Sequence, residues 1–307
     1  MKFARPEKQA RDAKKQVTAH GKSRAETRGK PLIPGFRSGE HFEKSMKDFV
    51  GWLQDQPEKA CIDTFTTDQA RQYLELRAQF IDQGQLDKDR YALKVWIEHR
   101  DGIKNAFRWR DYKDKGQDNS RLAKESRYYT PEQMRMVQAH QQPHNAFATK
   151  VAYEAGLRAK ELYTIAKPHE QPADERPWRP DKNVGQPDHR YTVIGKGGLI
   201  REIRLSPETA RQLEATRRET PATITDRGVH YTSRYAIGGG NAWSSSFTRA
   251  SERALRWTAG AHSTRHSYVQ ERMEQLQQRG YNWQDAREVV SQEVGHFSTQ
   301  HTDEYLR

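Results

Sequence analysis

The sequence predicts a mainly α-helical protein with a small antiparallel β-sheet, divided into two domains. Three observations support this fold class. The length of 307 residues corresponds to about two domains of roughly 150 residues each. Apolar residues recur at helical spacing over much of the chain. One pair of β-type runs flanks a Gly-rich turn. Ten Phe, thirteen Tyr and seven Trp provide for real cores and argue against global disorder.

Residues 1–30 are predicted to be a basic N-terminal tail. They hold ten Lys and Arg against three Asp and Glu, and so supply seven of the twelve net positive charges. No sustained apolar period runs through them. Two interpretations remain open and are compatible: a solvated, disordered segment, and a basic arm that lies along DNA and becomes ordered on binding.

Residues 31–115 are predicted to form a helical domain with a basic outer surface, followed by a polar linker over 116–128. One helical face combines Phe42, Met46, Phe49, Val50 and Leu53. A second helix begins at a capping box, Thr66 to Gln69, and continues through Ala70, Tyr73, Leu74, Phe80 and Ile81. A third carries Leu93, Trp96, Ile97, Ile103 and Phe107.

The second domain is predicted over residues 129–307. Thr130-Pro131-Glu132-Gln133 has the residue types of a helix start. Residues 151–163 are expected to be helical on both sides of Gly156, and the Pro-rich segment 168–189 to be a loop. Two β-type runs, 191–194 and 199–205, flank Gly195-Lys196-Gly197-Gly198 and predict a hairpin.

The rest of this domain is predicted to be helical. One helix begins at Pro207, and another covers about 242–258 after the break at Gly238-Gly239-Gly240. The remainder, 262–307, is expected to be helical with breaks near Gly280 and Gly295.

Charge and composition limit the partners. The net charge of +12 favours a polyanion such as double-stranded DNA, because fixed cations release counterions condensed on phosphates. No apolar run approaches the about 18 residues of a membrane span, and no leader of the secretory type stands at the N-terminus. The single Cys61 excludes an internal disulfide and fits a reducing cytosol. We therefore expect a cytoplasmic protein with no membrane partner.

Four short segments of the second domain carry candidate chemistry. They contain Arg158 in Gly-Leu-Arg-Ala-Lys-Glu-Leu, Lys196 at the hairpin tip, His262-Ser-Thr-Arg265, and Gly-His296 with Tyr305 nine residues later. Each alone has a commoner structural explanation, such as a surface ion pair, a solvated lysine or a helix cap. His262 and His266 have the i, i+4 spacing of metal ligands, but Ser263 breaks the His-Glu-x-x-His pattern and no third ligand is evident. We expect neither metal nor cofactor.

In this order, Arg, Lys, His-x-x-Arg, His and Tyr resemble the tyrosine recombinase (phage integrase) family, which breaks and rejoins DNA through a phosphotyrosine. The likeness covers about 129–307, and more weakly residues 38–112. It implies a helical core-binding domain followed by an α/β catalytic domain. The family motifs fall on a set of six catalytic candidates: Arg158, Lys196, His262, Arg265, His296 and Tyr305.

The chemistry of phosphodiester attack explains these residue types. Arg158 and Arg265 would hold the phosphate, because a guanidinium is permanently charged and donates two parallel hydrogen bonds. The phenol of Tyr305, with an ordinary pKa near 10, needs a base, for which His262 is the candidate. His296 would donate to the phosphate or orient the site. Lys196 would protonate the leaving 5′-oxygen. His266 is an alternative to His262, although the His-x-x-Arg spacing favours His262.

The resemblance also implies partners and a biological role. It implies a homotetramer on two DNA sites, accessory DNA-bending or directionality factors, and a bacterial, nucleoid-associated enzyme that integrates or excises a mobile genetic element. Two departures from the family pattern stand out. Val294 occupies the position before Gly-His where the family often has Leu. The interval from Arg265 to His296 is longer than usual in the family, which indicates an insertion within residues 274–290. Many relatives have a docking helix after the tyrosine, whereas two residues follow Tyr305 in this sequence. Two explanations stay open: assembly through other contacts, or a sequence that is a shortened form of the protein.

Two other functions remain open. A type IB topoisomerase uses nearly the same residues but acts as a monomer and reseals its own strand. A non-catalytic DNA-binding regulator or architectural protein would keep the fold, but loss of at least one of the six residues would then be expected. The domain layout and the Gly-Leu-Arg string favour the recombinase.

Overall fold

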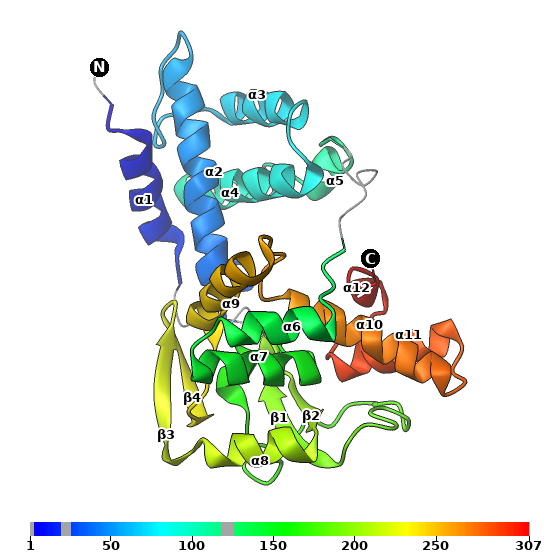
Figure 1. The fold of residues 1–307 in the computed structure, drawn as a ribbon. Helices are drawn as coiled ribbons and strands as arrows, with labels where there is room; N and C mark the ends of the chain where they lie inside the picture. The colour runs from blue at the N-terminus through cyan, green and yellow to red at the C-terminus, as the bar shows by residue number, and fades with distance from the viewer. Residues whose placement is uncertain (1–2, 20–25, 118–125, 307) are drawn as a thin grey trace. The chain divides into compact units, whose positions relative to one another are not determined.

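The computed structural model describes residues 3–19, 26–117 and 126–306 (Figure 1). The chain divides into two units, Met1–Ala123 and Lys124–Arg307. The division falls inside the predicted linker, most of which, residues 118–125, lies outside the described residues. The predicted fold class is confirmed: the structure is mainly helical, with two small antiparallel sheets in the described part of the chain.

The first unit is helical around one apolar core. Its helices are α1 (Pro6–Val17), α2 (Phe36–Asp55), α3 (Thr67–Ala78), α4 (Gln83–Asp101) and α5 (Trp109–Tyr112). The capping box at Thr66 and Gln69 is confirmed. The predicted third helix is too long, because Gly102 adopts φ 70° and ends α4, which leaves Ile103 exposed. Phe80, beyond the end of α3, is also exposed.

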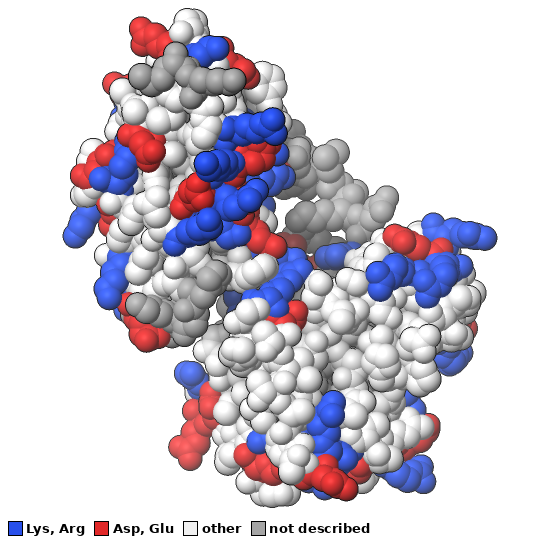
Figure 2. Space-filling view, turned by 90° about the vertical axis from the view of Figure 1, so that its left-hand side faces the viewer, with Lys and Arg blue, Asp and Glu red and all other residues white. Residues whose placement is uncertain are grey.

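Helix α1 corrects the prediction of a tail without structure. Ala10, Ala13 and Val17 recur on one face of α1 and are buried in the core of the first unit. Lys14 pairs with Glu43 at 2.7 Å. Figure 2 shows Asp and Glu side chains among the Lys and Arg of this unit. The apolar face of α1 consists largely of alanine, which is too short for the periodicity to stand out among the charges. Residues 20–25 of the predicted tail lie outside the described residues.

The second unit combines helices with two hairpins. In chain order its elements are α6 (Pro131–Ala139), α7 (Pro143–Ala155), the 3-10 turn η2 (Glu161–Thr164), β1 (His189–Ile194), the 3-10 turn η3 (Lys196–Gly198), β2 (Ile200–Leu205), α8 (Pro207–Ala215), β3 (Arg217–Asp226), β4 (Val229–Tyr235), α9 (Gly240–Leu255), α10 (Ser263–Gln278), α11 (Trp283–Glu293) and α12 (Gln300–Asp303). The helix start at Thr130 is confirmed, with a complete capping box.

Gly156 breaks the helix that was predicted to continue through it. Its φ is 59°, and a Cβ there would lie 2.5 Å from the Tyr268 ring. A glycine tolerates both the left-handed backbone and this close approach. Helix α7 therefore ends at Ala155, and the chain turns before the short 3-10 turn η2. This turn carries Arg158 away from the helix axis.

The predicted hairpin is confirmed, and a second hairpin was not predicted. β1 pairs antiparallel with β2, with Tyr191 opposite Ile203. β3 and β4 form a separate two-stranded sheet, whose many Thr, Arg and Glu residues give little apolar alternation. The breaks at Gly280 and Gly295 are confirmed, with φ of 91° and 75°. Within the described residues, no helix is both long and apolar enough to cross a membrane.

Candidate active site

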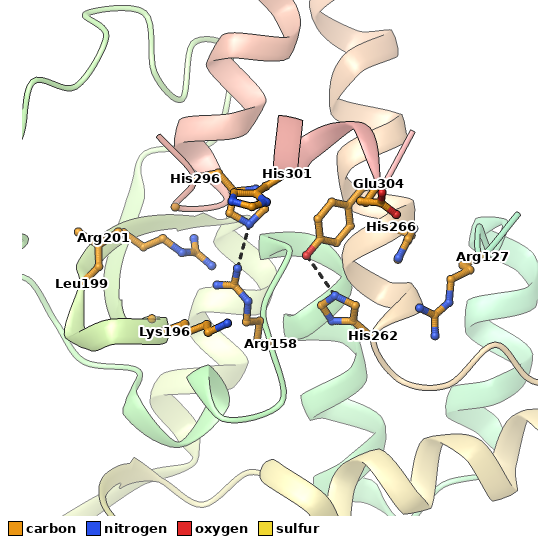
Figure 3. Close-up of a pocket in the computed structure, with 13 residues that line it drawn as sticks. Arg127, Arg158, Lys196, Leu199, Arg201, His262, His266, His296, His301 and Glu304 are labelled. Carbon is orange, nitrogen blue, oxygen red and sulfur yellow. Dashed lines mark hydrogen bonds between the residues drawn. The ribbon is translucent and has the colours of Figure 1, made fainter. Parts of the chain in front are cut away.

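An open cavity of about 730 Å³ in the second unit gathers most of the predicted site residues (Figure 3). Five of the six line it; the sixth, Arg265, is fully buried. The cavity is lined by Arg127, Arg158, Gly195, Lys196, Leu199, Arg201, His262, His266, Gly295, His296, His301, Glu304 and Tyr305. In Figure 3, Arg158, Arg201 and Lys196 lie on one side of it, and His262 and His266 on the other.

The five predicted residues that line the cavity each lie at the end of an element or in a turn. Arg158 follows the turn at Gly156, and Lys196 occupies the tip between β1 and β2. His262 is the residue before α10. His296 follows the break at Gly295 after α11, and Tyr305 lies just beyond α12. Turns thus bring together residues that are up to 147 positions apart in the chain.

Glu161 is the buried centre of the positive charge. Its carboxylate accepts from Arg158 at 2.8 Å and from Arg201 at 2.8 Å, and lies 3.8 Å from Arg265. Although burial alone would raise it, Arg201, Arg265 and Arg158 lower the pKa of Glu161 to about 2. Three guanidiniums thus share one carboxylate, which leaves an excess of two positive charges in this cluster. Such an excess favours an anion in the cavity.

The guanidinium of Arg265 donates hydrogen bonds to backbone carbonyls of the protein rather than into the cavity. Its Nη1 donates to the carbonyl of Gly156 at 2.7 Å, and its Nη2 donates to the carbonyl of Val294. Its Nε is buried without a hydrogen-bond partner among the described residues. The expectation that Arg265 offers two free parallel N–H groups to a phosphate is therefore not met in this arrangement.

His296 accepts hydrogen bonds from arginine. Its Nε2 lies 3.0 Å from Arg158 Nη2 and 3.4 Å from Arg265 Nη2. A guanidinium can only donate, so Nε2 is the unprotonated nitrogen, and Nδ1 can donate to Thr302 Oγ1 at 3.2 Å. Burial, followed by the charges of Arg265 and Arg158, lowers the pKa of His296 to about 3. His296 is therefore neutral at pH 7 in this arrangement.

The hydroxyl of Tyr305 forms a hydrogen bond with the imidazole of His262. Tyr305 Oη lies 3.1 Å from His262 Nε2, and Tyr305 is 8% exposed. Burial and nearby cations, Arg265 first among them, lower the pKa of His262 to about 3, so this imidazole is neutral and able to accept a proton. The ring of His266 packs on the Tyr305 ring at 4.7 Å between centroids. Of the two histidines, His262 is the one in hydrogen-bond contact with the phenolic oxygen.

Lys196 differs from the other lining cations. It is exposed at the hairpin tip, and it makes no hydrogen bond or ion pair within the part of the chain that the structure describes. Gly197 and Gly198 follow it with φ of 84° and 89°. Its ammonium is therefore free to approach a bound group.

Sequence reasoning missed Arg201 and did not assign Glu161 a role. A signal for Arg201 was present: β2 alternates, and Arg201 shares the buried face with Ile203 and Leu205. A charged residue on the inward face of a strand indicates a buried partner. No comparable local signal marks Arg127 or His301. Among the described residues, no group of three or more His, Cys, Asp or Glu side chains could hold a metal ion.

Known proteins resemble this chain in structure. No protein-family model and no curated protein matches the sequence. The XerH site-specific recombinase, solved with its difH substrate, matches with a TM-score of 0.53 at 16% identity, over 89% of this chain and 76% of XerH. A lambda integrase dimer bound to a COC′ core site matches with a TM-score of 0.55 at 12% identity, over 88% of this chain and 71% of the integrase.

A second lambda integrase structure, of residues 75–356, matches with a TM-score of 0.53 at 12% identity over 92% of this chain and 91% of that one. These likenesses extend over both units of the chain, and they agree with the fold that the motifs predicted. The chain has the fold of the tyrosine recombinases.

Proposed function

We propose that this protein is a site-specific DNA recombinase of the tyrosine type, which cleaves and rejoins DNA strands through a 3′-phosphotyrosine. The observation that carries the proposal is the placement of Tyr305 Oη 3.1 Å from His262 Nε2, in a cavity that also exposes Arg158 and Lys196. A phenol beside a neutral imidazole, next to uncompensated guanidiniums, is an arrangement for attack on a phosphodiester.

The phosphodiester would bind where the positive charge is in excess. Arg158 reaches the cavity and is held by Glu161 at 2.8 Å, so its guanidinium is oriented before DNA binds. Arg265 and Arg201, both buried, would act mainly through their charge from beneath. Donors fixed in advance commonly contribute about 10²–10³ in rate each.

The reaction needs two proton transfers, one from the attacking phenol and one to the leaving oxygen. His262 would accept the phenolic proton as Tyr305 attacks phosphorus, and the negative charge of the bound phosphate would raise the low pKa of His262. Lys196 would give a proton to the departing 5′-oxygen. The P–O bond to the 5′-oxygen breaks as the bond to Tyr305 forms, leaving a free 5′-hydroxyl.

The covalent intermediate makes strand exchange independent of ATP. The phosphotyrosine ester retains the free energy of the broken phosphodiester, so a 5′-hydroxyl from a second strand can attack it and expel Tyr305. A water nucleophile would instead lose that energy through hydrolysis. This chemistry suits recombination, and we infer integration or excision of a mobile element as the role.

Double-stranded DNA is the proposed substrate. The XerH structure contains its difH substrate, and the lambda integrase structure contains a dimer on one core site. By analogy we propose that two protomers occupy one DNA site and that four act on two sites. The net charge of +12 agrees with a nucleic-acid partner.

Covalent capture tests the proposal. Wild-type protein expressed in cells should form covalent protein–DNA adducts, and sequencing their junctions should reveal one recurrent site. On a nicked suicide duplex with that site, Tyr305→Phe should bind DNA normally and form no adduct, because it lacks the nucleophilic oxygen. Adducts formed by Tyr305→Phe would place the nucleophile elsewhere. Relaxation of supercoiled plasmids that lack the site would indicate a topoisomerase, and the absence of any adduct a non-catalytic DNA-binding protein.

A further inference from the structure

The long loop of residues 168–189, here called the bracing loop, has no part in the proposed chemistry. It leads from η2 to β1. The sequence analysis identified it only as a Pro-rich loop. Its contacts, however, include two segments that carry site residues: the start of β2, next to Arg201, and the end of α11, next to His296. A solvated connection would not need contacts to both.

The first set of contacts joins the bracing loop to β2. The backbone N–H of Asp174 donates to the carbonyl of Ile200 at 2.9 Å. In return, the N–H of Ile200 donates to Asp174 Oδ2 at 3.2 Å. Asp174 is therefore fixed beside the first residue of β2, directly before Arg201.

The second set joins the bracing loop to α11. The N–H of Arg179 donates to Gln292 Oε1 at 2.7 Å, and Arg179 Nη1 donates to Glu288 Oε2 at 2.6 Å. The N–H of Asn183 donates to Glu293 Oε1 at 3.2 Å. These bonds hold the loop along the last two turns of the helix that leads to His296.

Trp178 connects the two sets. Its Nε1 donates to the carbonyl of Asp174 at 3.1 Å, and Lys182 Nζ lies 3.6 Å from the centroid of the indole. Held in this way, the indole packs on Phe297 in a tilted arrangement, with 4.9 Å between ring centroids and 36° between planes. Phe297 immediately follows His296 and is 52% exposed, so Trp178 supplies an aromatic surface that a solvent-facing Phe would otherwise lack.

The turn between α11 and α12 carries His296 and Phe297. It begins at Gly295 in the left-handed region and is short. Ser291 fixes part of its backbone: its carbonyl accepts from the N–H of His296 at 2.7 Å, and its Oγ donates to the His296 carbonyl at 3.2 Å. These bonds set the backbone of His296. Ser291 Oγ also lies 3.4 Å from the Ser298 carbonyl, and the Phe297 side chain adds the ring contact with Trp178.

We propose that Trp178 is a positioning residue, which fixes the turn after α11 through its ring contact with Phe297 and so presents His296 to Arg158. The effect on DNA cleavage rests on the proposed function; the effect on His296 does not. The bracing loop is thus a structural support for one wall of the candidate active site, and Trp178 is its aromatic contact with the turn that carries His296.

The first arm of the test observes His296 without DNA. In protein labelled with ¹⁵N-histidine, the ring shifts of His296 at pH 7 should report the Nδ1–H tautomer that the bonds to Arg158 and Thr302 require. Trp178→Ala should give shifts averaged between the two tautomers, and Trp178→Phe, which keeps an aromatic face, should restore the single tautomer. His296→Gln identifies the signal. An unchanged His296 spectrum in a folded Trp178→Ala protein would overturn the proposal.

The second arm measures cleavage of the nicked duplex recovered from wild-type adducts. Trp178→Ala should bind this duplex normally and form the adduct about 10-fold more slowly, because a small misplacement of an oriented group costs this much or more. Trp178→Phe should cleave at close to the wild-type rate. A 5′-bridging phosphorothiolate should not rescue Trp178→Ala, since the defect is not in protonation of the leaving group.

Trp283→Ala is the matched control. Like Trp178 beside Lys182, Trp283 lies next to a cation, Arg287, and it belongs to α11, but among the described residues it makes no ring contact with Phe297. It should change neither arm. A wild-type cleavage rate in Trp178→Ala, a Trp178→Phe protein as slow as Trp178→Ala, or rescue by the phosphorothiolate would each contradict the proposal. If wild-type protein forms no adduct, the proposed function fails, and the histidine spectrum alone decides this inference.

Discussion

Two regions of one cavity differ sharply in how they hold their charge. The cavity floor, formed by Glu161, Arg201 and Arg265, is 0–1% exposed, and each of its charged groups has protein partners. The cavity rim, formed by Gly195–Gly198 with Lys196, is largely exposed, and Lys196 makes no hydrogen bond or ion pair within the described residues. Burial therefore separates charges that the fold needs from a charge that is needed only for the proposed chemistry.

The physical reason is desolvation. A buried ion must be compensated by partners, and removal of one partner leaves the others uncompensated in a medium that solvates them poorly. An exposed lysine is solvated by water whether or not a ligand is present. Substitutions should thus alter stability at the floor and reaction rate at the rim.

The largest expected effect lies at the rim. Lys196→Ala should slow adduct formation by about 100-fold or more, because it removes the proposed general acid, and should leave the free energy of unfolding unchanged. Single-turnover cleavage and urea unfolding measure the two quantities. Lys160→Ala, at an exposed lysine that does not line the cavity, is the control. A 5′-bridging phosphorothiolate should restore the rate; without that rescue, Lys196 is not the acid.

The second effect lies at the floor. Glu161→Gln keeps the shape of the side chain but leaves three guanidiniums without their carboxylate, so the free energy of unfolding should fall by about 3–5 kcal/mol. Urea unfolding at pH 7 measures this. Glu208→Gln, which removes an exposed carboxylate paired with Lys150, should have almost no effect. Equal losses in the two variants would remove the distinction between buried and exposed charge.

The pH dependence sharpens the same point. The pKa of Glu161 is about 2 in the folded protein, against an ordinary value of 4.5. A carboxyl with a lowered folded pKa contributes stability that is complete above its unfolded pKa and is lost as pH falls through the folded one. Wild-type stability should therefore decrease between about pH 5 and pH 2, and Glu161→Gln should decrease less steeply. Parallel curves would show that Glu161 does not contribute.

The smallest effect compares two glycines. Gly295 and Gly197 both have left-handed backbones, so alanine should cost about 1–2 kcal/mol at each. A Cβ at Gly295 would also lie 2.9 Å from Arg201 Cδ, whereas nothing lies within 4 Å of one at Gly197. Gly295→Ala should therefore lower the melting temperature more than Gly197→Ala. A larger decrease in melting temperature for Gly197→Ala would mean that the cavity floor accommodates a new Cβ with less loss of stability than the rim.

Local signals in the sequence determined much of this protein. Thr66 and Thr130 begin helices because their side chains satisfy N–H groups three residues ahead. The Gly-Lys-Gly-Gly turn specified a hairpin with Lys196 at its tip. The ordered motifs indicated that Arg158, His262, His296 and Tyr305 would meet, and these residues do line one cavity.

Only the tertiary structure decided which of these charges is buried and what supports them. The pairing of Arg201 with Glu161, the enclosure of Arg265 by two carbonyls, and the packing of Trp178 on Phe297 each join segments 29 to 119 residues apart. Short-range periodicity carries no information on such pairs, because the energy that orders them arises only when distant elements exclude water together. For the same reason, the sequence did not predict helix α1, whose alanine-rich face is recognised as apolar only because the tertiary structure buries it.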